Sequence, residues 1–347
     1  MSETAGPESV ASMLMLVRTA RGMTQGEVAK KAHLSQGLLS KAETGMLSLD
    51  RGRLAAVARA LDVPVDRFTS SAPPDGVLSA CTFHRKRSSL SVSDAKRIRA
   101  LLDLTRLQVE GLVDEGTPEL GLPRESPSAD GYTSPEDIAG SVRRVLTEET
   151  GPIANLVHEA EQLGVLMVNR NLGAPRIDAI GSWPAGHRPL FLLNDSAPAD
   201  RKRFTLAHEL GHTVMHPAPV PDQEAEADRF ASELLMPAAE IRAELHNLSL
   251  ARLVALKRRW RVSMAALVRR ARDVGTISDH EYKMLNIEFS TAGYRTREPV
   301  DIADETPTLI TEIIQRRLSA GETVTELARK AHQHEAEFQT LYGGAVL

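Results

Sequence analysis

The chain has 347 residues, which is enough for two or three domains. Hydrophobic residues make up 42% of it and charged residues 25%, as is usual in soluble globular proteins. No apolar run approaches the roughly 18 residues of a membrane span, and no secretory signal is evident, so we expect a cytoplasmic protein that does not bind membranes. The single cysteine, Cys81, excludes an intramolecular disulfide. The net charge of −4 excludes a general attraction for nucleic acid, which would need local basic patches.

Residues 9–70 are predicted to form a compact bundle of four or five short helices. Apolar residues recur at helical spacing in "SVASMLMLVRTARG", which ends at Gly22. Thr24 and Glu27 match a capping box at the start of the next helix, and a similar helix follows between residues 35 and 45. One more helix and a short fifth one are predicted in "LDRGRLAAVARALDVPVDRF". This unit has nine Lys/Arg and five Asp/Glu, so it is locally basic.

Residues 71–133 are predicted to hold a basic helix and a linker. The run "CTFHRKRSSLS" is strongly basic, and the spacing of apolar residues indicates a long amphipathic helix over residues 93–113. Proline, glycine and serine are frequent in residues 114–133. We therefore expect this last segment to be an extended and mobile connection that a protease can cut easily.

The next unit, residues 134–245, is predicted to be mainly helical with a small sheet. A helix follows Ser134, and "GVLMVNR" and "RPLFLLN" are two apolar runs of strand length. The helix that contains "HELGH" is predicted to end before Pro217, and the helix that contains "EAEADRFASELLM" before Pro237. With a helical bundle before it and helices after it, this unit gives the chain an α+β fold class.

Residues 246–347 are predicted to be helical, and no tandem repeat is evident in the chain. The block 249–285 is predicted to form a helix, a turn and a helix, and its basic residues are Lys257, Arg258, Arg259, Arg261, Arg269, Arg270 and Arg272. This block is either a second helix-turn-helix-like surface for nucleic acid or the solvated face of a helical support, and we favour the support. Two further helices are predicted within residues 306–332.

Three histidines recur at four-residue intervals in "TLAHELGHTVMH", residues 205–216. Four residues advance an α-helix by about one turn, so His208 and His212 lie on one face and can bind one cation. Glu209 lies beside them, where a carboxylate can accept a proton from water. This HExxH spacing suits a zinc hydrolase, in which two imidazoles hold the ion. Zinc is the metal that we expect, with another divalent ion as the alternative.

A catalytic zinc site also needs a third protein ligand and an open fourth position. Glu224 and Asp228 lie four residues apart in "EAEAD" and share a helix face, so Glu224 can be the third ligand and Asp228 can orient a ligand histidine. Glu226 is a weaker candidate because it faces elsewhere. His216 is the rival third ligand, but it directly precedes the proline that ends its helix, which favours a capping role or a supporting one beside the ligands.

The two motifs together, "RFTLAHELGHTVMH" and "EAEADRFASELLMP", resemble the ImmA/IrrE family of bacterial metallopeptidases over roughly residues 135–240. The resemblance implies that His208 and His212 are ligands and that Glu224 is the third one. It also implies that Glu209 is the catalytic base. The run "RPLFLLN" resembles the family's strand beside the active site, an edge that can pair with a substrate backbone. The sequence does not identify a residue that would stabilise an oxyanion.

The N-terminal bundle resembles the helix-turn-helix unit of the XRE family of repressors. The matching runs are "RTARGMTQGEVAKKAHLSQGLLSKAETG" and "LAAVARALDVP". In that fold the second helix of the pair enters the major groove with its first residues toward base edges. The resemblance implies a reading helix from Gln36 to about Glu43. Its side chains toward DNA are Gln36, Ser40 and Lys41, and Gln25 lies against the DNA backbone.

Together these features predict a transcription regulator that joins an XRE-type DNA-binding domain to a zinc-dependent peptidase domain. In the first hypothesis, an active endopeptidase cleaves a repressor-type protein, or this chain itself within residues 114–133, and so relieves repression. In the second, the peptidase-like domain is a sensor or partner-binding module of a regulator or antitoxin. Double-stranded operator DNA is the expected partner, a homodimer the expected assembly and single-stranded DNA a candidate signal.

Overall fold

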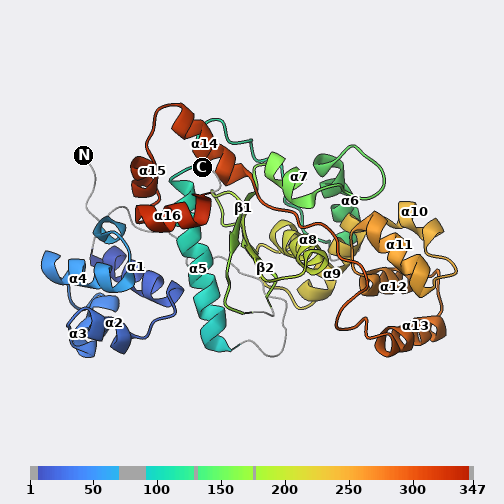
Figure 1. Cartoon of the computed structure of the whole chain (residues 1–347), viewed down its shortest axis with the longest axis horizontal. Coiled ribbons are helices and arrows are strands. Elements are labelled where there is room, and N and C mark those ends of the chain that lie inside the picture. The colour runs from blue at the N-terminus through green and yellow to red at the C-terminus, as the bar shows by residue number, and fades with distance from the viewer. Residues whose placement is uncertain (1–6, 70–90, 129–131, 175–176, 344–347) are drawn as a thin grey trace.

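A computed structural model of the chain describes residues 7–69, 91–128, 132–174 and 177–343. Figure 1 shows an elongated molecule, with the N-terminal bundle at one end, a small sheet in the middle and a group of helices at the other end. The fold class is α+β, as predicted. Among the described residues, no helix combines the length and the apolar character of a membrane span. Cys81 and most of the predicted basic run after it lie outside the described residues.

Five short helices form the N-terminal bundle, as the sequence predicts. They are α1 (Pro7–Ala20), α2 (Gln25–Lys31), α3 (Gln36–Glu43), α4 (Arg51–Leu61) and the 3₁₀ helix η1 (Val65–Phe68). The predicted capping box starts α2, because the Thr24 hydroxyl accepts a hydrogen bond from the backbone N–H of Glu27 and the Glu27 carboxylate accepts one from the N–H of Thr24. Leu39 of α3 is buried in the core of the bundle, so the polar side of α3 faces solvent.

Helix α5 (Val92–Glu110) joins the bundle to the rest of the molecule (Figure 1). Its Ala100 and Leu104 are buried in the core of the N-terminal bundle, whereas Ile98 and Leu102 are buried in a second core that includes the sheet. The sequence predicts this helix with one apolar face, but two sides of it are buried. Because one helix contributes to two cores, buried apolar surface holds the bundle and the sheet together.

The segment 114–128, predicted to be mobile, is packed onto the following unit. Leu122 is buried, and the backbone N–H of Glu125 donates a hydrogen bond to the carbonyl of Val214 (3.2 Å). The prediction of mobility is therefore wrong for these residues. Amino-acid composition indicates a propensity for turns, but it does not indicate which contacts a segment makes with distant parts of the chain.

Within the part of the chain that the structure describes, the sheet has three strands in the order β1-β3-β2. β1 (Leu166–Arg170) pairs with β3 (Leu190–Asn194) in parallel, and β2 (Ala179–Ser182) pairs with β3 in antiparallel fashion. β1 and β3 are the two apolar runs that the sequence predicts. β2 is not predicted, because four residues that include a glycine give too short a pattern. Phe191 and Leu192 of β3 belong to different cores, so helices cover both faces of the sheet.

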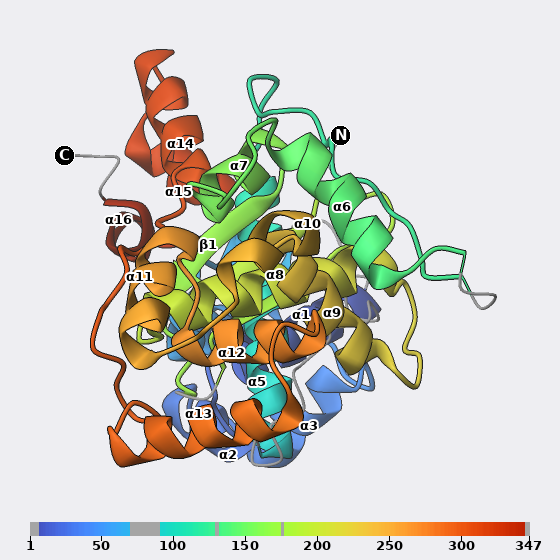
Figure 2. The same ribbon diagram turned by 90° about the vertical axis from the view of Figure 1, so that its right-hand side faces the viewer.

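Four helices cover one face of the sheet. They are α6 (Pro135–Leu146), α7 (Leu156–Gln162), α8 (Ala199–Met215) and α9 (Gln223–Leu235). α8 and α9 lie side by side, as both views show (Figures 1 and 2). α8 ends before Pro217 and α9 before Pro237, as the sequence predicts.

The helices that follow fall into two groups. The first extends the core of α8 and α9 and consists of α10 (Ala238–Ile241), the 3₁₀ helix η3 (Arg242–Glu244), α11 (Leu250–Trp260), α12 (Met264–Asp273) and α13 (Asp279–Thr291). The second packs with α5 on the other face of the sheet and consists of α14 (Leu309–Ser319), α15 (Val324–Lys330) and α16 (Glu335–Tyr342). Figure 1 shows the two groups well apart. The sequence predicts α14 and α15 but not α16.

Candidate metal centre and DNA-reading surface

Two neighbouring helices bring the predicted metal ligands together. α8 carries His208, Glu209 and His212, all of them buried. α9 carries Glu224 in its first turn, where 35% of the side chain remains exposed. Three ionisable side chains buried in one helix cost free energy unless they have partners, so this arrangement favours a bound ligand.

The donor atoms of the three predicted ligands converge. The Nε2 atoms of His208 and His212 lie 3.0 Å apart. One Glu224 oxygen lies 3.7 Å from Nε2 of His208, and the other lies 3.5 Å from Nε2 of His212. Two imidazoles and one carboxylate are the donor set of a catalytic zinc site, which leaves a fourth position for water or substrate. These residues therefore fit a divalent metal, and zinc in particular.

The other imidazole nitrogens contact residues around the cluster. Asp228 of α9 accepts a hydrogen bond from Nδ1 of His208 (2.8 Å). Nδ1 of His212 faces Nδ1 of His216 (3.1 Å), and Nε2 of His216 faces a carboxylate oxygen of Glu226 (2.7 Å). These contacts direct Nε2 of both predicted ligand histidines at the shared position. His216 thus lies beside His212 and not among the three converging donors.

The electrostatics of the cluster favour a cation. Burial alone would lower the pKa of His208, but hydrogen bonds to the carboxylates of Asp228 and Glu224 raise it to about 9. Burial lowers the pKa of His212 to about 4, and the neighbouring His208 adds to this effect. His212 is therefore neutral near pH 7, as a metal ligand must be. The carboxylates that favour a proton on His208 favour a metal ion at the same place.

Glu209 is buried beside the cluster, toward β2. Its carboxylate accepts a hydrogen bond from the backbone N–H of Gly181. Its Oε2 atom has no hydrogen-bond partner among the described residues. Burial raises the pKa of this carboxyl to about 8, although the neighbouring His208 favours the ionised form. A buried carboxylate oxygen without a partner, next to a metal-binding cluster, suits a group that binds and deprotonates water.

The edge strand next to the cluster is β2 and not the predicted run "RPLFLLN". That run forms β3, whose two sides are already paired with β1 and β2, so it cannot accept a substrate backbone. Among the described residues, β2 pairs with β3 alone. A Cβ atom on Gly181 would lie 2.2 Å from Cε1 of Phe191, so the close approach of these two strands requires glycine.

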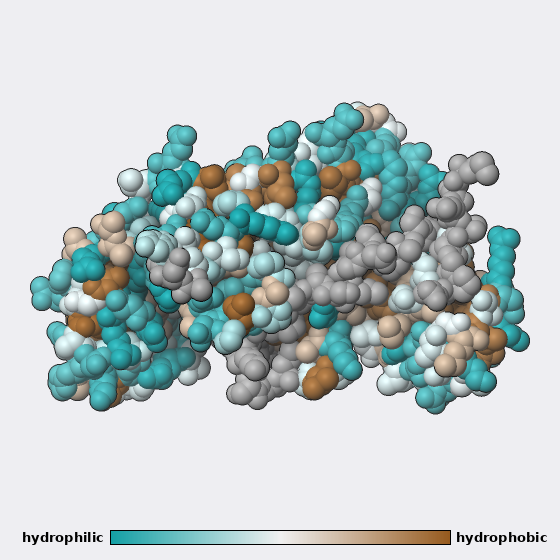
Figure 3. Space-filling view, turned by 180° about the vertical axis from the view of Figure 1, so that it is seen from behind, coloured by the Kyte–Doolittle hydropathy of each residue, from teal (hydrophilic) through white to brown (hydrophobic). Residues whose placement is uncertain are grey.

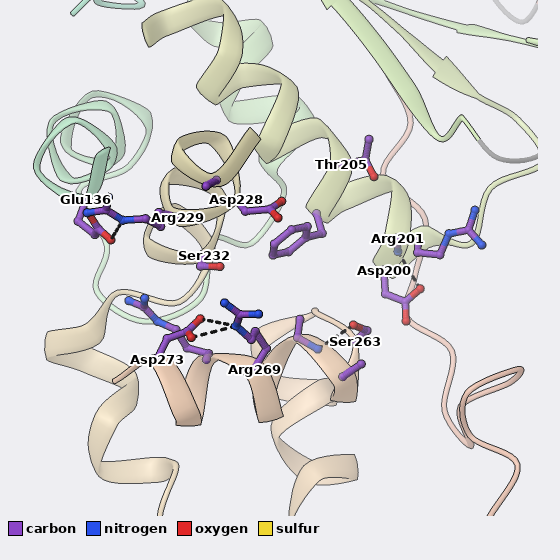
Figure 4. A pocket seen from close by; sticks show the side chains of 15 residues that line it. Glu136, Asp200, Arg201, Thr205, Asp228, Arg229, Ser232, Ser263, Arg269 and Asp273 are labelled. Carbon is purple, nitrogen blue, oxygen red and sulfur yellow. Dashed lines mark hydrogen bonds and ion pairs between the residues drawn. The ribbon is translucent and has the colours of Figure 1, made fainter. Parts of the chain in front are cut away.

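A cavity of about 660 Å³ adjoins the cluster between α8, α9 and α12 (Figure 4). Asp228, which contacts a predicted ligand histidine, lines it. Cationic side chains in its wall are paired with acids, as Arg269 is with Asp273 (2.9 Å) and Arg229 with Glu136 (2.6 Å). The cavity is therefore polar and balanced in charge, and it does not favour an anion.

The contacts of the basic block 249–285 favour a support over a nucleic-acid surface. Lys257 is buried between Asp200 (2.5 Å) and Glu298 (2.7 Å). Further ion pairs of the block are Arg259–Glu244, Arg261–Glu305, Arg269–Asp273, Arg270–Glu233 and Arg272–Asp279. Cations that are already paired with carboxylates have little attraction left for phosphates.

The four side chains that are predicted to contact DNA differ in how exposed they are to solvent. α3 extends from Gln36 to Glu43, the predicted bounds of the reading helix. Gln36 and Lys41 are exposed, whereas Ser40 is half-buried. Gln25 is also half-buried, and its amide donates a hydrogen bond to the Glu43 carboxylate (2.8 Å). Gln25 therefore braces α2 against α3 and does not point outward.

Two family models match the chain. A helix-turn-helix model matches residues 14–68, which include α2 and α3. A model of the IrrE N-terminal-like domain matches residues 160–272, which include the sheet, α8, α9 and the converging donors. Neither the curated proteins nor the solved structures include a match to the chain.

Proposed function

We propose that this chain, which joins an XRE-type helix-turn-helix domain to an IrrE-like peptidase domain, is a transcription regulator whose peptidase cleaves a repressor-type protein. The substrate is another helix-turn-helix protein or a copy of this chain, and its loss relieves repression. The proposal depends on one observation above all, the convergence of His208, His212 and Glu224 beside the buried carboxylate of Glu209.

In this proposal His208, His212 and Glu224 hold the zinc ion, and Asp228 and His216 orient the two imidazoles. When bound, zinc supplies a Lewis acid that polarises the scissile carbonyl and lowers the pKa of water. The buried site lowers the local dielectric constant and thereby strengthens the electrostatic contacts made there.

Glu209 is the proposed general base. Its Oε2 atom takes a proton from the attacking water, and the same carboxyl then returns the proton to the leaving amine. Burial favours the protonated carboxyl that the second step needs, whereas the neighbouring His208 favours the ionised carboxylate that the first step needs. An extended substrate segment adds to the side of β2 that β3 does not occupy, which brings a peptide bond between β2 and α8.

The helix-turn-helix domain is the proposed DNA reader. α3 presents Gln36, which can pair with adenine, and Lys41, which can contact guanine or phosphate. Ser40 is a further candidate contact at the edge of this surface. Gln25 supports α3 through Glu43 and is the weakest of the four candidates.

The proposed assembly on DNA is a homodimer, because operators of helix-turn-helix repressors are two-fold symmetric. The back of the molecule is mostly hydrophilic, and its hydrophobic residues form small separate groups (Figure 3). The coloured part of that face therefore offers no large apolar patch for a subunit interface. Analytical ultracentrifugation with and without operator DNA tests the assembly.

The test of the function is a cleavage assay with the purified full-length chain, zinc and candidate helix-turn-helix repressors, with and without single-stranded DNA. We expect a discrete cut by the parent chain and none by Glu209→Gln, because the amide keeps the size of the side chain but cannot accept the proton. Equal cutting by both chains would mean that another protease is responsible. A chain that binds zinc and DNA and cuts nothing would favour the sensor or antitoxin hypothesis.

A further inference from the structure

Residues 309–343 repeat the pattern of the N-terminal bundle. The run "TVTELARKAH" (323–332) aligns with "TQGEVAKKAH" (24–33) at a constant offset of 299 residues. Six of the ten residues are identical, and two more are exchanges of Val for Leu and of Lys for Arg. The two runs lie far apart in the chain, so they are a dispersed repeat and not a tandem one.

The two segments also fold alike. α2 and α15 have seven residues each, and α3 and α16 have eight. Both α2 and α15 start with a capping box between a threonine and the glutamate three residues later. Each is followed by a histidine with positive φ, 56° at His33 and 50° at His332. Positive φ is uncommon outside glycine, so the same turn at the same position indicates a shared structure.

The core positions of the two segments correspond as well. α14 precedes α15 as α1 precedes α2, and each connection contains a glycine with positive φ at the same position, Gly22 in the first and Gly321 in the second. Four buried residues of the first segment have buried counterparts in the second: Val28 and Leu327, Ala29 and Ala328, Ala32 and Ala331, Leu39 and Phe338. α14–α16 therefore form a second unit of the helix-turn-helix kind.

The helix that would read DNA differs in chemistry between the two units. Gln36 and Lys41 correspond to Glu335 and Thr340, which are also exposed. Residues 10–44 have five Lys/Arg and two Asp/Glu, whereas residues 309–343 have four Lys/Arg and five Asp/Glu. An acidic helix is repelled by the phosphate backbone, so the second unit lacks the charge that DNA binding requires.

The second unit instead contacts the first one through its turn and the start of α16. Four polar contacts join them: Arg21–Glu337 (2.9 Å), Arg67 to the Ala331 carbonyl (3.4 Å), His332–Asp66 (3.5 Å) and His334–Asp62 (3.9 Å). In both ribbon views α15 and α16 lie on the opposite side of the bundle from α2 and α3 (Figures 1 and 2). These contacts therefore leave the proposed reading surface of α3 uncovered.

We infer that residues 309–343 are a second helix-turn-helix unit that binds protein and not DNA, and that its partner is the N-terminal unit of the same chain. Its turn and the start of α16 dock on η1, on the connection between α4 and η1 and on the end of α1, and so fix the position of the reader relative to the peptidase. The contrast between α16 and α3 rests on the proposal above that α3 reads DNA.

The first test compares corresponding positions in the full-length chain. Gln36→Ala/Lys41→Ala changes the first unit, and Glu335→Ala/Thr340→Ala changes the same positions of the second. The probe is a duplex that the parent chain selects from a random library. We expect the first pair to weaken binding at least about tenfold and the second to leave it unchanged. A comparable loss in the second pair would overturn the inference, and a loss in neither would overturn the proposed reading helix.

The second test addresses docking and does not depend on DNA. Glu337→Arg places like charges opposite each other at Arg21, and Arg21→Glu/Glu337→Arg restores an ion pair in reversed order. We expect faster hydrogen exchange of the backbone amides in 62–68 and 331–337 in the single variant and recovery in the double variant. Gln339→Arg, at an exposed position of α16, controls for the added arginine. Unchanged exchange in Glu337→Arg would overturn the docking surface.

Discussion

Asp228 and His208 lie 2.8 Å apart, with the Asp228 carboxylate accepting a hydrogen bond from Nδ1 of the ring. Such a bond fixes the orientation of a ligand histidine and increases its basicity. We expect Asp228→Asn to weaken zinc affinity by about 10–100-fold, whereas His208→Ala and Glu224→Ala lose the metal altogether. Titration against a competing chelator measures the affinities, and elemental analysis measures occupancy.

Glu226→Gln is the matched control for Asp228→Asn. Glu226 contacts His216, which in turn contacts His212, so it is one residue farther from the metal position. We expect a smaller loss of affinity than for Asp228→Asn. Full occupancy in His208→Ala and Glu224→Ala would contradict the proposed ligand set.

Gly181 permits the close packing of β2 against β3. A Cβ atom there would lie 2.2 Å from the buried ring of Phe191. We expect Gly181→Ala to destabilise the chain by about 1–3 kcal/mol and to slow cleavage, because β2 must move away from its place beside Glu209. Urea unfolding and the cleavage assay measure the two effects.

Two variants make this prediction specific. Gly181→Ala/Phe191→Leu should recover part of the loss, because the smaller side chain makes room for the new methyl group. Gly140→Ala in α6 has only an ordinary contact at 3.9 Å and should instead stabilise the helix by roughly 0.5–1 kcal/mol. Unchanged stability in Gly181→Ala would show that β2 does not need glycine.

Glu161 joins α7 to the start of α14. Its buried carboxylate accepts hydrogen bonds from the backbone N–H groups of Thr308 (3.0 Å) and Leu309 (3.1 Å). Burial raises its pKa from 4.5 to about 7, although these hydrogen bonds favour the ionised form. The folded chain therefore holds this proton more tightly than the unfolded chain. The contribution of Glu161 to the free energy of unfolding therefore falls as pH rises from about 4.5 to about 7, and it is constant at higher pH.

Glu161→Gln should remove this part of the pH dependence, because an amide still accepts a hydrogen bond and does not titrate. Across that pH range, the free energy of unfolding of the parent chain should fall by on the order of 1–3 kcal/mol more than that of the variant. Urea unfolding of both chains at several pH values measures it. An identical pH dependence in parent and variant would show that Glu161 titrates normally in the folded chain.

Local signals make much of the fold predictable. The capping box at Thr24 and Glu27 and the prolines after α8 and α9 act within a few residues, so the sequence alone places these helix ends. The HExxH spacing likewise places His208 and His212 on one helix face, because the period of an α-helix is the same wherever the helix lies in a fold.

Features that depend on distant contacts are not predictable in this way. β2 packs closely on β3 because Gly181 leaves room for the ring of Phe191, and neither residue indicates this alone. Glu226 is predicted to face elsewhere, but the turn between α8 and α9 brings it to His216. The C-terminal unit is not recognised as a counterpart of the first because the close similarity is confined to residues 323–332, and α16 begins with the acidic Glu335 where α3 begins with Gln36.

Self-cleavage within residues 114–133 requires that the packed part of this segment first come free. The Ser126 hydroxyl donates a hydrogen bond to the carbonyl of Met215 (2.7 Å), and Leu122 is buried. A substrate must be extended and free to pair with β2, whereas this segment is bonded at the end of α8. We therefore expect the isolated chain to stay intact in the presence of zinc while it cuts a separate helix-turn-helix protein.

Leu122→Ala should release the segment, because loss of a buried leucine typically costs about 2–5 kcal/mol of packing. We expect a time course by mass spectrometry to show fragments cut within 114–133 in Leu122→Ala and none in Leu122→Ala/Glu209→Gln. Fragments in both variants would identify a contaminating protease. Fragments that form as fast in the parent chain as in Leu122→Ala would mean that the packing of Leu122 does not protect the segment. In that case the chain is its own substrate without any release step, and the inducing signal must act on the metal centre instead.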